Sequence, residues 1–297
     1  MKAWFKNVIG VAMAVTCSTS LLFAPSAQAD LFYQISGKDL TQPSYLYGTM
    51  HMLCQDDFYI DPSVTEAFAK TEQLVLEIDL TDPALAQVFQ QHSAQPDAQY
   101  LRKFLNAEQH QQMNQYFVDN LGADLTQIGH LRPFILTSLL LPMQLNCQQQ
   151  ASYDGYFAEQ AQLGGHTIAE LETPLFQLDL FNQVPVAEQV NWLWDMISDP
   201  ASSQAEMQKL NQLYIQGDAD KLYAYTVAQP EFAEYEALLL SDRNRDWVVK
   251  LPQMMASKPS FIAVGAGHLG GDQGVVALLR EAGYQVQAIK VERPTTN

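Results

Sequence analysis

The sequence predicts an α/β fold: a central mixed sheet, flanked by helices, with a helical insertion. Residues 31–53 have the pattern of a strand hairpin, with strands expected at 31–35 and 44–47. Residues 261–289 close the chain as strand, glycine-rich turn, helix and strand, which is the pattern of a β-α-β unit. A hairpin supplies antiparallel strands and a β-α-β unit supplies parallel ones, so one sheet holding both is expected to be mixed.

The next elements after the hairpin are a helix from Pro62 to Lys70 and a strand from Leu74 to Leu80. In a strand of that length Glu77 and Asp79 share one face by period-two alternation. Carboxylates among so many apolar neighbours are costly unless they are paired or bind a ligand. This singles out Glu77, whereas Asp79 also fits a turn at the strand's end.

Residues 83–150 are expected to form the helical insertion. Asn106 with Gln109 has the pattern of a capping box that starts a helix, and Gly122 fits its end. Pro133 is well placed to open the next helix. Whether this insertion is a lid or plain scaffold stays open.

A second sheet-forming unit follows the insertion. A helix around Tyr156 is expected to end at Gly164-Gly165, and a strand from His166 to Leu171 leads to Glu172. A long helical stretch then runs from about Val186 to Met255 and is interrupted by glycine and proline.

Two Gly-x-x-His elements follow strand-like segments near opposite ends of the chain. The first is Gly48-Thr49-Met50-His51 and the second is Gly265-Ala266-Gly267-His268, in a chain with only six histidines. Ligands of open α/β sheets bind where strands end. His51 and His268 are therefore expected to be brought together as two halves of one site.

The first 29 residues have the pattern of a cleavable export signal. Lys2 and Lys6 precede an apolar run that is too short to span a bilayer, and Ala27-Gln28-Ala29 matches the small-x-small cleavage pattern. Cleavage after Ala29 would leave a single domain from residue 30 to 297, with no stable membrane span, in the periplasm or secreted.

The mature chain is strongly acidic. Loss of Lys2 and Lys6 leaves 14 of the 16 basic residues against 33 acidic ones, a net charge of −19. Phosphate binding needs Lys and Arg, so this balance argues against nucleic acid and anionic membranes as partners. Cys54 and Cys147 remain after cleavage, either as a disulfide, which an oxidising compartment permits, or as two buried thiols.

Several common catalytic patterns are absent from the sequence. It has no Gly-x-Ser-x-Gly elbow and no His-Glu-x-x-His helix. The run Gly265-x-Gly267-x-x-Gly270 matches a dinucleotide fingerprint, but it lies in the last unit of an exported chain and holds a histidine in its turn, which argues against that use.

The remaining candidates for chemistry are two histidines, three acids and two arginines: His51, His268, Glu77, Asp154, Glu172, Arg243 and Arg245. Histidine with carboxylate suits a divalent metal such as Mn, Co, Zn or Fe. The same groups could do metal-free acid–base work, with an arginine stabilising an anion. The residues alone leave both options open.

Five motifs in order carry a family resemblance. They are Tyr45-Leu46-Tyr47-Gly48-Thr49-Met50-His51, Leu76-Glu77-Ile78-Asp79, Leu171-Glu172-Thr173, Arg243-Asn244-Arg245-Asp246-Trp247 and Val264-Gly265-Ala266-Gly267-His268-Leu269. In this order they resemble the TraB/GumN family, which includes the Tiki ectodomains. The resemblance covers essentially the whole mature chain and implies an α/β fold like that of erythromycin esterase and the haem-binding ChaN proteins.

The resemblance to Tiki implies a metal-dependent peptidase, helped by Mn or Co. Carried over residue by residue, it implies His51, Glu77 and His268 as essential, with Glu172 and Arg243 in support. This chain has Ser152-Tyr153-Asp154 where Gly-x-Asp is more usual, so Asp154 is left out of the predicted set.

The leading hypothesis is an exported metal-dependent hydrolase acting on a peptide or small exported substrate. His51 and His268 would help hold the ion, with Glu77 as ligand or general base and Glu172 as ligand or supporting group. Arg243 would bind a substrate carboxylate, steady an oxyanion or clamp the C-terminal helix. The alternatives are a non-catalytic exported protein that binds peptide, haem or metal, and a metal-free esterase-like hydrolase.

Overall fold

The centre of the molecule is a six-stranded sheet in strand order β6-β4-β7-β2-β1-β8. The computed structural model describes residues 30–38, 40–291 and 293. The strands of the sheet are β1 (Phe32–Ser36), β2 (Ser44–Thr49), β4 (Gln73–Leu76), β6 (Thr167–Glu170), β7 (Ser260–Gly265) and β8 (Gln285–Ala288).

The sheet is mixed, as the sequence predicts. Strands β6, β4, β7 and β2 are all parallel to one another. Strand β1 pairs antiparallel with β2 on one side and with β8 on the other. The carboxyl ends of four neighbouring parallel strands therefore meet at one edge of the sheet.

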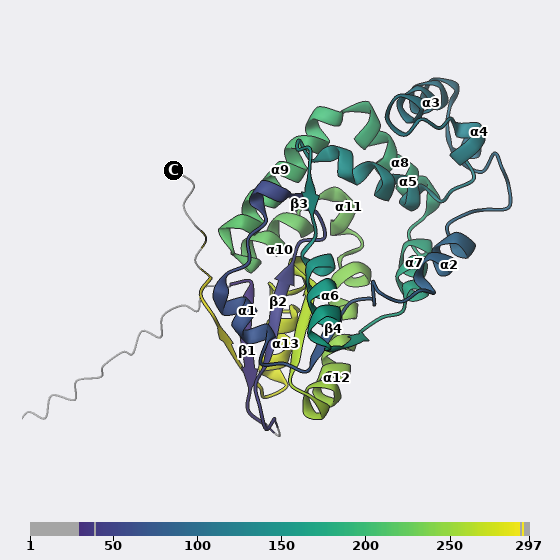
Figure 1. Ribbon diagram of the computed structural model, residues 1–297. Helices are drawn as coiled ribbons and strands as arrows, with labels where there is room; N and C mark the ends of the chain where they lie inside the picture. Colours follow the sequence, from purple (N-terminus) through teal and green to yellow (C-terminus); the bar gives the residue numbers. More distant parts are fainter. Residues whose placement is uncertain (1–29, 39, 292, 294–297) are drawn as a thin grey trace, which may run out of the picture.

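The two central strands are buried along their whole length. Every residue of β2 and of β7 is buried, the pattern of strands covered on both faces. Figure 1 shows α1 (Pro62–Phe68) and α6 (Tyr153–Gly164) on one face of the sheet, and α12 (Asp242–Ser257) and α13 (Val275–Glu281) on the other. On the α6 face the ring of Phe157 packs against that of Phe261 from β7, with the centroids 4.7 Å apart.

The remaining helices gather beyond the carboxyl ends of the parallel strands (Figure 1). They are α2 (Leu85–His92), α3 (Ala107–Leu121), α4 (Leu125–Ile128), α5 (Pro133–Leu140), α7 (Pro174–Asn182), α8 (Val186–Ser198), α9 (Pro200–Gln216), α10 (Ala219–Val227) and α11 (Pro230–Ala233). The predicted capping box of Asn106 and Gln109 is present, Gly122 ends α3 with φ +68°, and Pro133 opens α5. A π-helical turn, Ala237–Ser241, leads into α12.

The helices of the insertion share an apolar core with α8. The buried members of this second cluster are Leu101, Leu105, Met113, Phe117, Leu125, Leu136, Leu140, Val190, Leu193 and Ile197. Residues from outside the 83–150 stretch thus complete its core, which ties the insertion to the rest of the helical layer.

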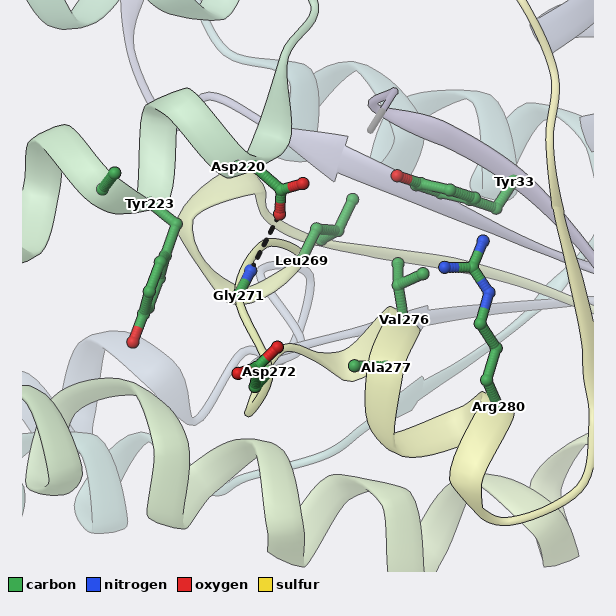
Figure 2. Close-up of a pocket in the computed structure, with 10 residues that line it drawn as sticks. Tyr33, Asp220, Tyr223, Leu269, Gly271, Asp272, Val276, Ala277 and Arg280 are labelled. Atoms are coloured by element: carbon green, nitrogen blue, oxygen red, sulfur yellow. Dashed lines mark hydrogen bonds between the residues drawn. The ribbon is translucent and has the colours of Figure 1, made fainter. Parts of the chain in front are cut away.

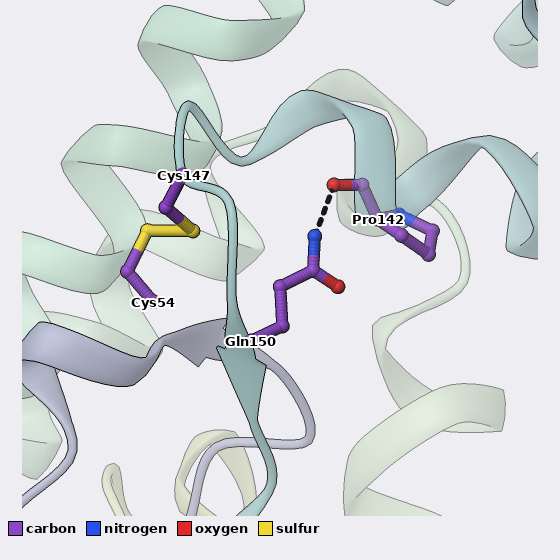
Figure 3. Close-up of a disulfide and its surroundings, with 4 residues drawn as sticks. All are labelled: Cys54, Pro142, Cys147 and Gln150. Carbon is purple, nitrogen blue, oxygen red and sulfur yellow. Dashed lines mark hydrogen bonds between the residues drawn. A yellow bond between two sulfur atoms is a disulfide. The ribbon is translucent and has the colours of Figure 1, made fainter.

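A disulfide joins Cys54 to Cys147 across 93 residues (Figure 3), which confirms the disulfide alternative. The bond lies beside a two-stranded antiparallel ribbon of β3 (Leu53–Cys54) and β5 (Gln150–Ala151). The Gln150 amide donates to the Pro142 carbonyl at 2.6 Å, next to the same bond. Ribbon and disulfide together hold the start of α6 close to the end of β2.

The predicted strand from Leu74 to Leu80 is too long. Strand β4 ends at Leu76, so Glu77 and Asp79 do not share a strand face. The Asp79 carboxylate accepts hydrogen bonds from the backbone and hydroxyl of Thr81, which turns the chain. Asp79 is therefore the turn residue that the alternative expected.

Among the described residues, no helix has the length and apolar character that a membrane span requires. The predicted export signal and its cleavage site at Ala29 lie outside the described residues. A disulfide is typical of exported proteins, and its presence here is consistent with export.

Candidate functional site

The predicted site residues meet at the carboxyl edge of the four parallel strands. His51 lies two residues beyond β2, and Glu77 directly follows β4. Glu172 lies two residues beyond β6, and His268 ends the short 3₁₀ turn Ala266–His268 after β7. Arg243 reaches the same place from the first turn of α12. The sheet order therefore brings together residues that are far apart in sequence.

Gly265 is the point at which three of these side chains converge. A Cβ atom at this glycine would lie 3.2 Å from Glu77 Oε1, 3.4 Å from His51 Nε2 and 3.7 Å from His268 Cδ2. The Gly265 backbone N–H also donates to Glu77 Oε1 at 2.8 Å. The absence of a side chain here leaves room for a small group between His51 and Glu77.

His51 is oriented by a carboxylate behind it. Its Nδ1 lies 2.8 Å from Asp154 Oδ2, and Thr49 Oγ1 donates to the other oxygen of Asp154 at 2.8 Å. Asp154 is buried, whereas the His51 side chain is 68% exposed to solvent. The charge of Asp154 raises the pKa of His51 to about 9, so the ring is an imidazolium at neutral pH.

Arg243 joins the acids of the site through a fully used guanidinium. Its Nη2 donates to Glu77 Oε2 at 2.7 Å and to Glu172 Oε2 at 2.8 Å, and its Nε donates to Glu172 Oε1 at 2.8 Å. Its Nη1 donates to the Leu239 carbonyl at 2.9 Å and lies 3.1 Å from His268 Nε2. These contacts engage all five N–H groups of the side chain, so none is left for a substrate anion.

The Glu172 carboxylate is held by three side-chain donors, those of Arg243, Trp247 and Gln177. The Trp247 indole N–H donates to Glu172 Oε1 at 2.8 Å, and the Gln177 amide donates to Glu172 Oε2 at 3.0 Å and to Glu77 Oε2 at 3.2 Å. With the guanidinium of Arg243, these contacts fix both carboxylates in a buried network. Gln177 and Trp247 were not among the predicted site residues, although Trp247 lies in one of the five motifs.

The contacts of His268 define its tautomer. Asn244 Nδ2 donates to the Gln273 carbonyl at 2.8 Å, so Asn244 presents its oxygen to His268 Nδ1, 2.6 Å away. Nδ1 therefore carries the proton and Nε2 accepts from Arg243. Burial, together with the charge of Arg243, lowers the pKa of His268 to about 3, so the ring is neutral.

Glu77 is ionised in spite of its burial. Burial favours the neutral acid, but the nearby charge of Arg243 and the Gly265 N–H hold the pKa of Glu77 well below its usual range. At neutral pH the centre thus contains an anionic Glu77, a cationic Arg243, a neutral His268 and a cationic His51.

The site as arranged does not fit a bound metal ion. Glu77 Oε2 and His268 Nε2, two atoms that could bind an ion, are turned to the guanidinium of Arg243. Within residues 30–38, 40–291 and 293, no three His, Cys, Asp or Glu side chains are placed to hold a metal. His51 Nε2 is the one predicted ligand atom that no described residue engages.

Arg245, the other arginine considered, does not join the site. It pairs with Asp242 and with the Gln273 side chain on the exposed face of α12. Gly270 of the dinucleotide-like run lies against α10, because a Cβ there would be 2.3 Å from the Ala219 carbonyl oxygen. Packing therefore explains why that position is glycine.

Two hollows of the described surface lie elsewhere. One cavity of about 460 Å³ lies beside the segment that comes after His268. It is lined by Leu269, Gly271, Asp220, Tyr223 and Arg280, among others (Figure 2). A second, of about 430 Å³, is lined by Tyr47 and the segment around Lys290. Neither is lined by His51, Glu77 or His268, whose centre opens to solvent at His51 instead.

Comparison of the sequence with known proteins identifies its family and one distant relative. The model of the TraB/PrgY/gumN family matches residues 31–288. A Danio rerio protein named metalloprotease TIKI1 is 23% identical over 307 aligned positions, which cover 85% of this chain and 62% of the relative. The chain thus spans less than two thirds of that relative's length. No solved structure matches the chain.

Proposed function

Since the chain belongs to the TraB/PrgY/gumN family, we propose that it is a hydrolase that cleaves peptide bonds in an exported peptide or small exported substrate. The observation that carries this proposal is the convergence of His51 Nε2 and Glu77 Oε1 on the space beside Gly265. A distant relative with the name metalloprotease supports the hydrolase class. The disulfide supports an exported setting.

The neutral form of His51 is the general base in this proposal. A water molecule between the two groups would donate one hydrogen bond to Glu77 Oε1 and its reacting proton to His51 Nε2. The water oxygen attacks the carbonyl carbon, the C–N bond breaks, and the new imidazolium returns the proton to the leaving amine. The products are one carboxylic acid and one amine.

Other residues of the centre act by positioning. Asp154 fixes the ring of His51 through Nδ1 and stabilises the imidazolium that forms, as the acid of a catalytic triad does. Arg243 holds Glu77 ionised and in place, and the Gly265 N–H fixes the carboxylate oxygen that faces the water. His268 completes the network as a neutral acceptor for Arg243.

A metal-dependent peptidase was the leading expectation from the sequence, with His51, His268, Glu77 and Glu172 as ligands. In the arrangement described here Arg243 engages three of those four residues. The proposed reaction therefore proceeds without a metal ion. The metal-dependent form remains testable in the same experiment.

The test is hydrolysis of a peptide library by the mature protein, residues 30–297, produced with its disulfide intact and followed by mass spectrometry. The wild type is compared with His51→Gln and Glu77→Gln, in chelator and with added Mn²⁺ or Co²⁺. His92→Gln, which replaces an exposed histidine at the end of α2, is the matched control.

We expect cleavage by the wild type and by His92→Gln, and a loss of about 100-fold or more in both site variants, the size of a lost general base. Activity in excess chelator supports the metal-free form, and activity only with added ion supports the metal-dependent one. Full activity of His51→Gln would contradict the proposal. Retention of peptides by wild type without any product would favour the binding-protein alternative.

A further inference from the structure

The cation at the centre of this site belongs to the chain itself. The guanidinium of Arg243 contacts Glu77 Oε2, Glu172 Oε2 and His268 Nε2 at 2.7, 2.8 and 3.1 Å. Two carboxylate oxygens and one imidazole nitrogen are a donor set that suits divalent ions such as Mn²⁺ and Co²⁺. All three donors are aimed at an arginine instead.

Because this contact is buried, the charges of its members must neutralise one another. The side chains of Arg243, Glu77 and Glu172 are 10%, 9% and 1% exposed, so water screens them little. Buried carboxylates without a counter-ion are strongly destabilising, and some cation must neutralise them. Arg243 supplies one positive charge to two carboxylates, whereas a divalent ion would supply two.

We infer that Arg243 fills the cation position of this centre, so that its guanidinium and a divalent metal ion bind Glu77, Glu172 and His268 in a mutually exclusive way. In the wild type the guanidinium holds the position and the centre needs no metal to stay folded. A metal enters only where the guanidinium has left. This exclusivity concerns cation binding alone and stands whether or not the chain hydrolyses peptides.

The local structure fits a side chain that is locked in place. Arg243 lies two residues after the π-helical turn Ala237–Ser241, whose Leu239 carbonyl accepts from Nη1. π-Helical turns are rare and often lie at functional sites, where they re-aim the residues that follow. This turn presents Leu239 as the fifth acceptor of the guanidinium, which holds the head group at the three donors.

The test removes the guanidinium and asks whether Co²⁺ takes its place. Arg243→Ala is compared with the wild type by isothermal titration and by the visible absorption of bound Co²⁺. Arg245→Ala is the matched control, because it removes an exposed arginine two residues away on the same helix. The double variant Arg243→Ala/Glu172→Gln keeps the opening but loses a donor.

We expect Arg243→Ala to bind one Co²⁺ with a visible band, under conditions in which the wild type and Arg245→Ala bind none. The double variant should bind at least about 10- to 100-fold more weakly. Co²⁺ should also raise the melting temperature of Arg243→Ala and leave that of the wild type unchanged. Stoichiometric Co²⁺ in the wild type, lost on Glu77→Gln, would overturn the inference, as would no gain in Arg243→Ala.

Arg243→Ala leaves two buried carboxylates without their cation and can fail to fold. In that case Arg243→Gln, whose amide still donates to a carboxylate, is measured in the same way. If neither variant folds alone, the yield of refolding with and without Co²⁺ becomes the readout. Recovery with the ion supports exclusivity, and no recovery contradicts it.

Discussion

His51 Nδ1 and Asp154 Oδ2 lie 2.8 Å apart, which couples an exposed imidazole to a buried carboxylate. The carboxylate stabilises the charged ring, so the neutral form, which is the proposed base, is the minor one below pH 9. The raised pKa makes neutral His51 a stronger base, but it also lowers the fraction of molecules that carry the neutral ring at neutral pH. This relationship determines how activity depends on pH.

We predict that kcat/KM rises with pH and levels off near pH 9, where His51 becomes neutral. Asp154→Asn removes the raising charge, so the pKa of His51 should move down towards its ordinary value. The rise should then occur at lower pH with a smaller maximum. pH–rate profiles, with the His51 ring proton followed by NMR, check this. A profile that falls between pH 7 and 9 would instead make the imidazolium the reactive form.

Stability should fall on both the acid and the alkaline side. The folded-state pKa of Glu77 is lowered, so its contribution is present above the ordinary pKa of about 4.5 and is lost as the pH falls below it. His268 has a folded-state pKa of about 3 against 6.5 unfolded, so stability also declines as the pH falls from 6.5 towards 3. His51, raised to about 9, contributes stability that is complete below pH 6.5 and lost as the pH rises through 9.

Urea unfolding at several pH values checks these signs. His51→Gln should remove the alkaline decline and leave the acid decline in place. His268→Gln should remove the decline that begins at pH 6.5, leaving the steeper loss below 4.5. An unchanged alkaline decline in His51→Gln would show that another group causes it.

A methyl group at Gly265 should stop hydrolysis with only a modest loss of stability. The Cβ of Gly265→Ala would lie 3.2 Å from Glu77 Oε1 and 3.4 Å from His51 Nε2, in the space assigned to the reacting water. Overpacking of this kind costs about 1–3 kcal/mol. The control is Gly155→Ala, next to Asp154, where the Cβ would make ordinary contacts of 3.6 and 3.7 Å with Ser152. Melting curves and peptide hydrolysis of both variants test this prediction. Normal turnover by Gly265→Ala would show that the reacting water lies elsewhere.

Opening the disulfide should affect activity as well as stability. Cys54→Ala/Cys147→Ala frees a loop of 93 residues, for which the loss is up to about 4–5 kcal/mol. The bond lies beside the β3–β5 ribbon, which links the segment after His51 to the segment before Asp154. We expect the pKa of His51 to fall, because its contact with Asp154 loosens. A double variant that is less stable but keeps the wild-type pH profile would limit the bond to a stabilising role.

Much of the fold follows from local patterns in the sequence. The capping box of Asn106, the glycine stop at Gly122 and the start at Pro133 involve neighbours within a few residues, and all three are confirmed. The predicted end of β4 was wrong, because the alternation of apolar residues continues past Leu76, where the strand ends. The chain turns at Asp79, whose carboxylate accepts hydrogen bonds from Thr81. The alternation of apolar residues does not reveal a side-chain hydrogen bond that competes with strand formation.

The site residues are brought together, but their pairing depends on the tertiary structure. Strand ends and two Gly-x-x-His elements place His51, Glu77 and His268 at one edge of a sheet. All five N–H groups of Arg243 make contacts inside the cluster because α12 crosses that edge of the sheet. The spacing of residues in the sequence does not predict this crossing. The same holds for Asp154, whose partner lies 103 residues earlier.

The direct pairing of β2 with β7 means that this centre cannot be completed until β7 has joined the sheet. The strands that carry the two Gly-x-x-His elements are neighbours in the sheet but come from the beginning and the end of the chain. A chain still emerging during synthesis or export has His51 without Gly265, Arg243 or His268. The site is therefore complete only once residues up to His268 have been synthesised and folded onto the sheet.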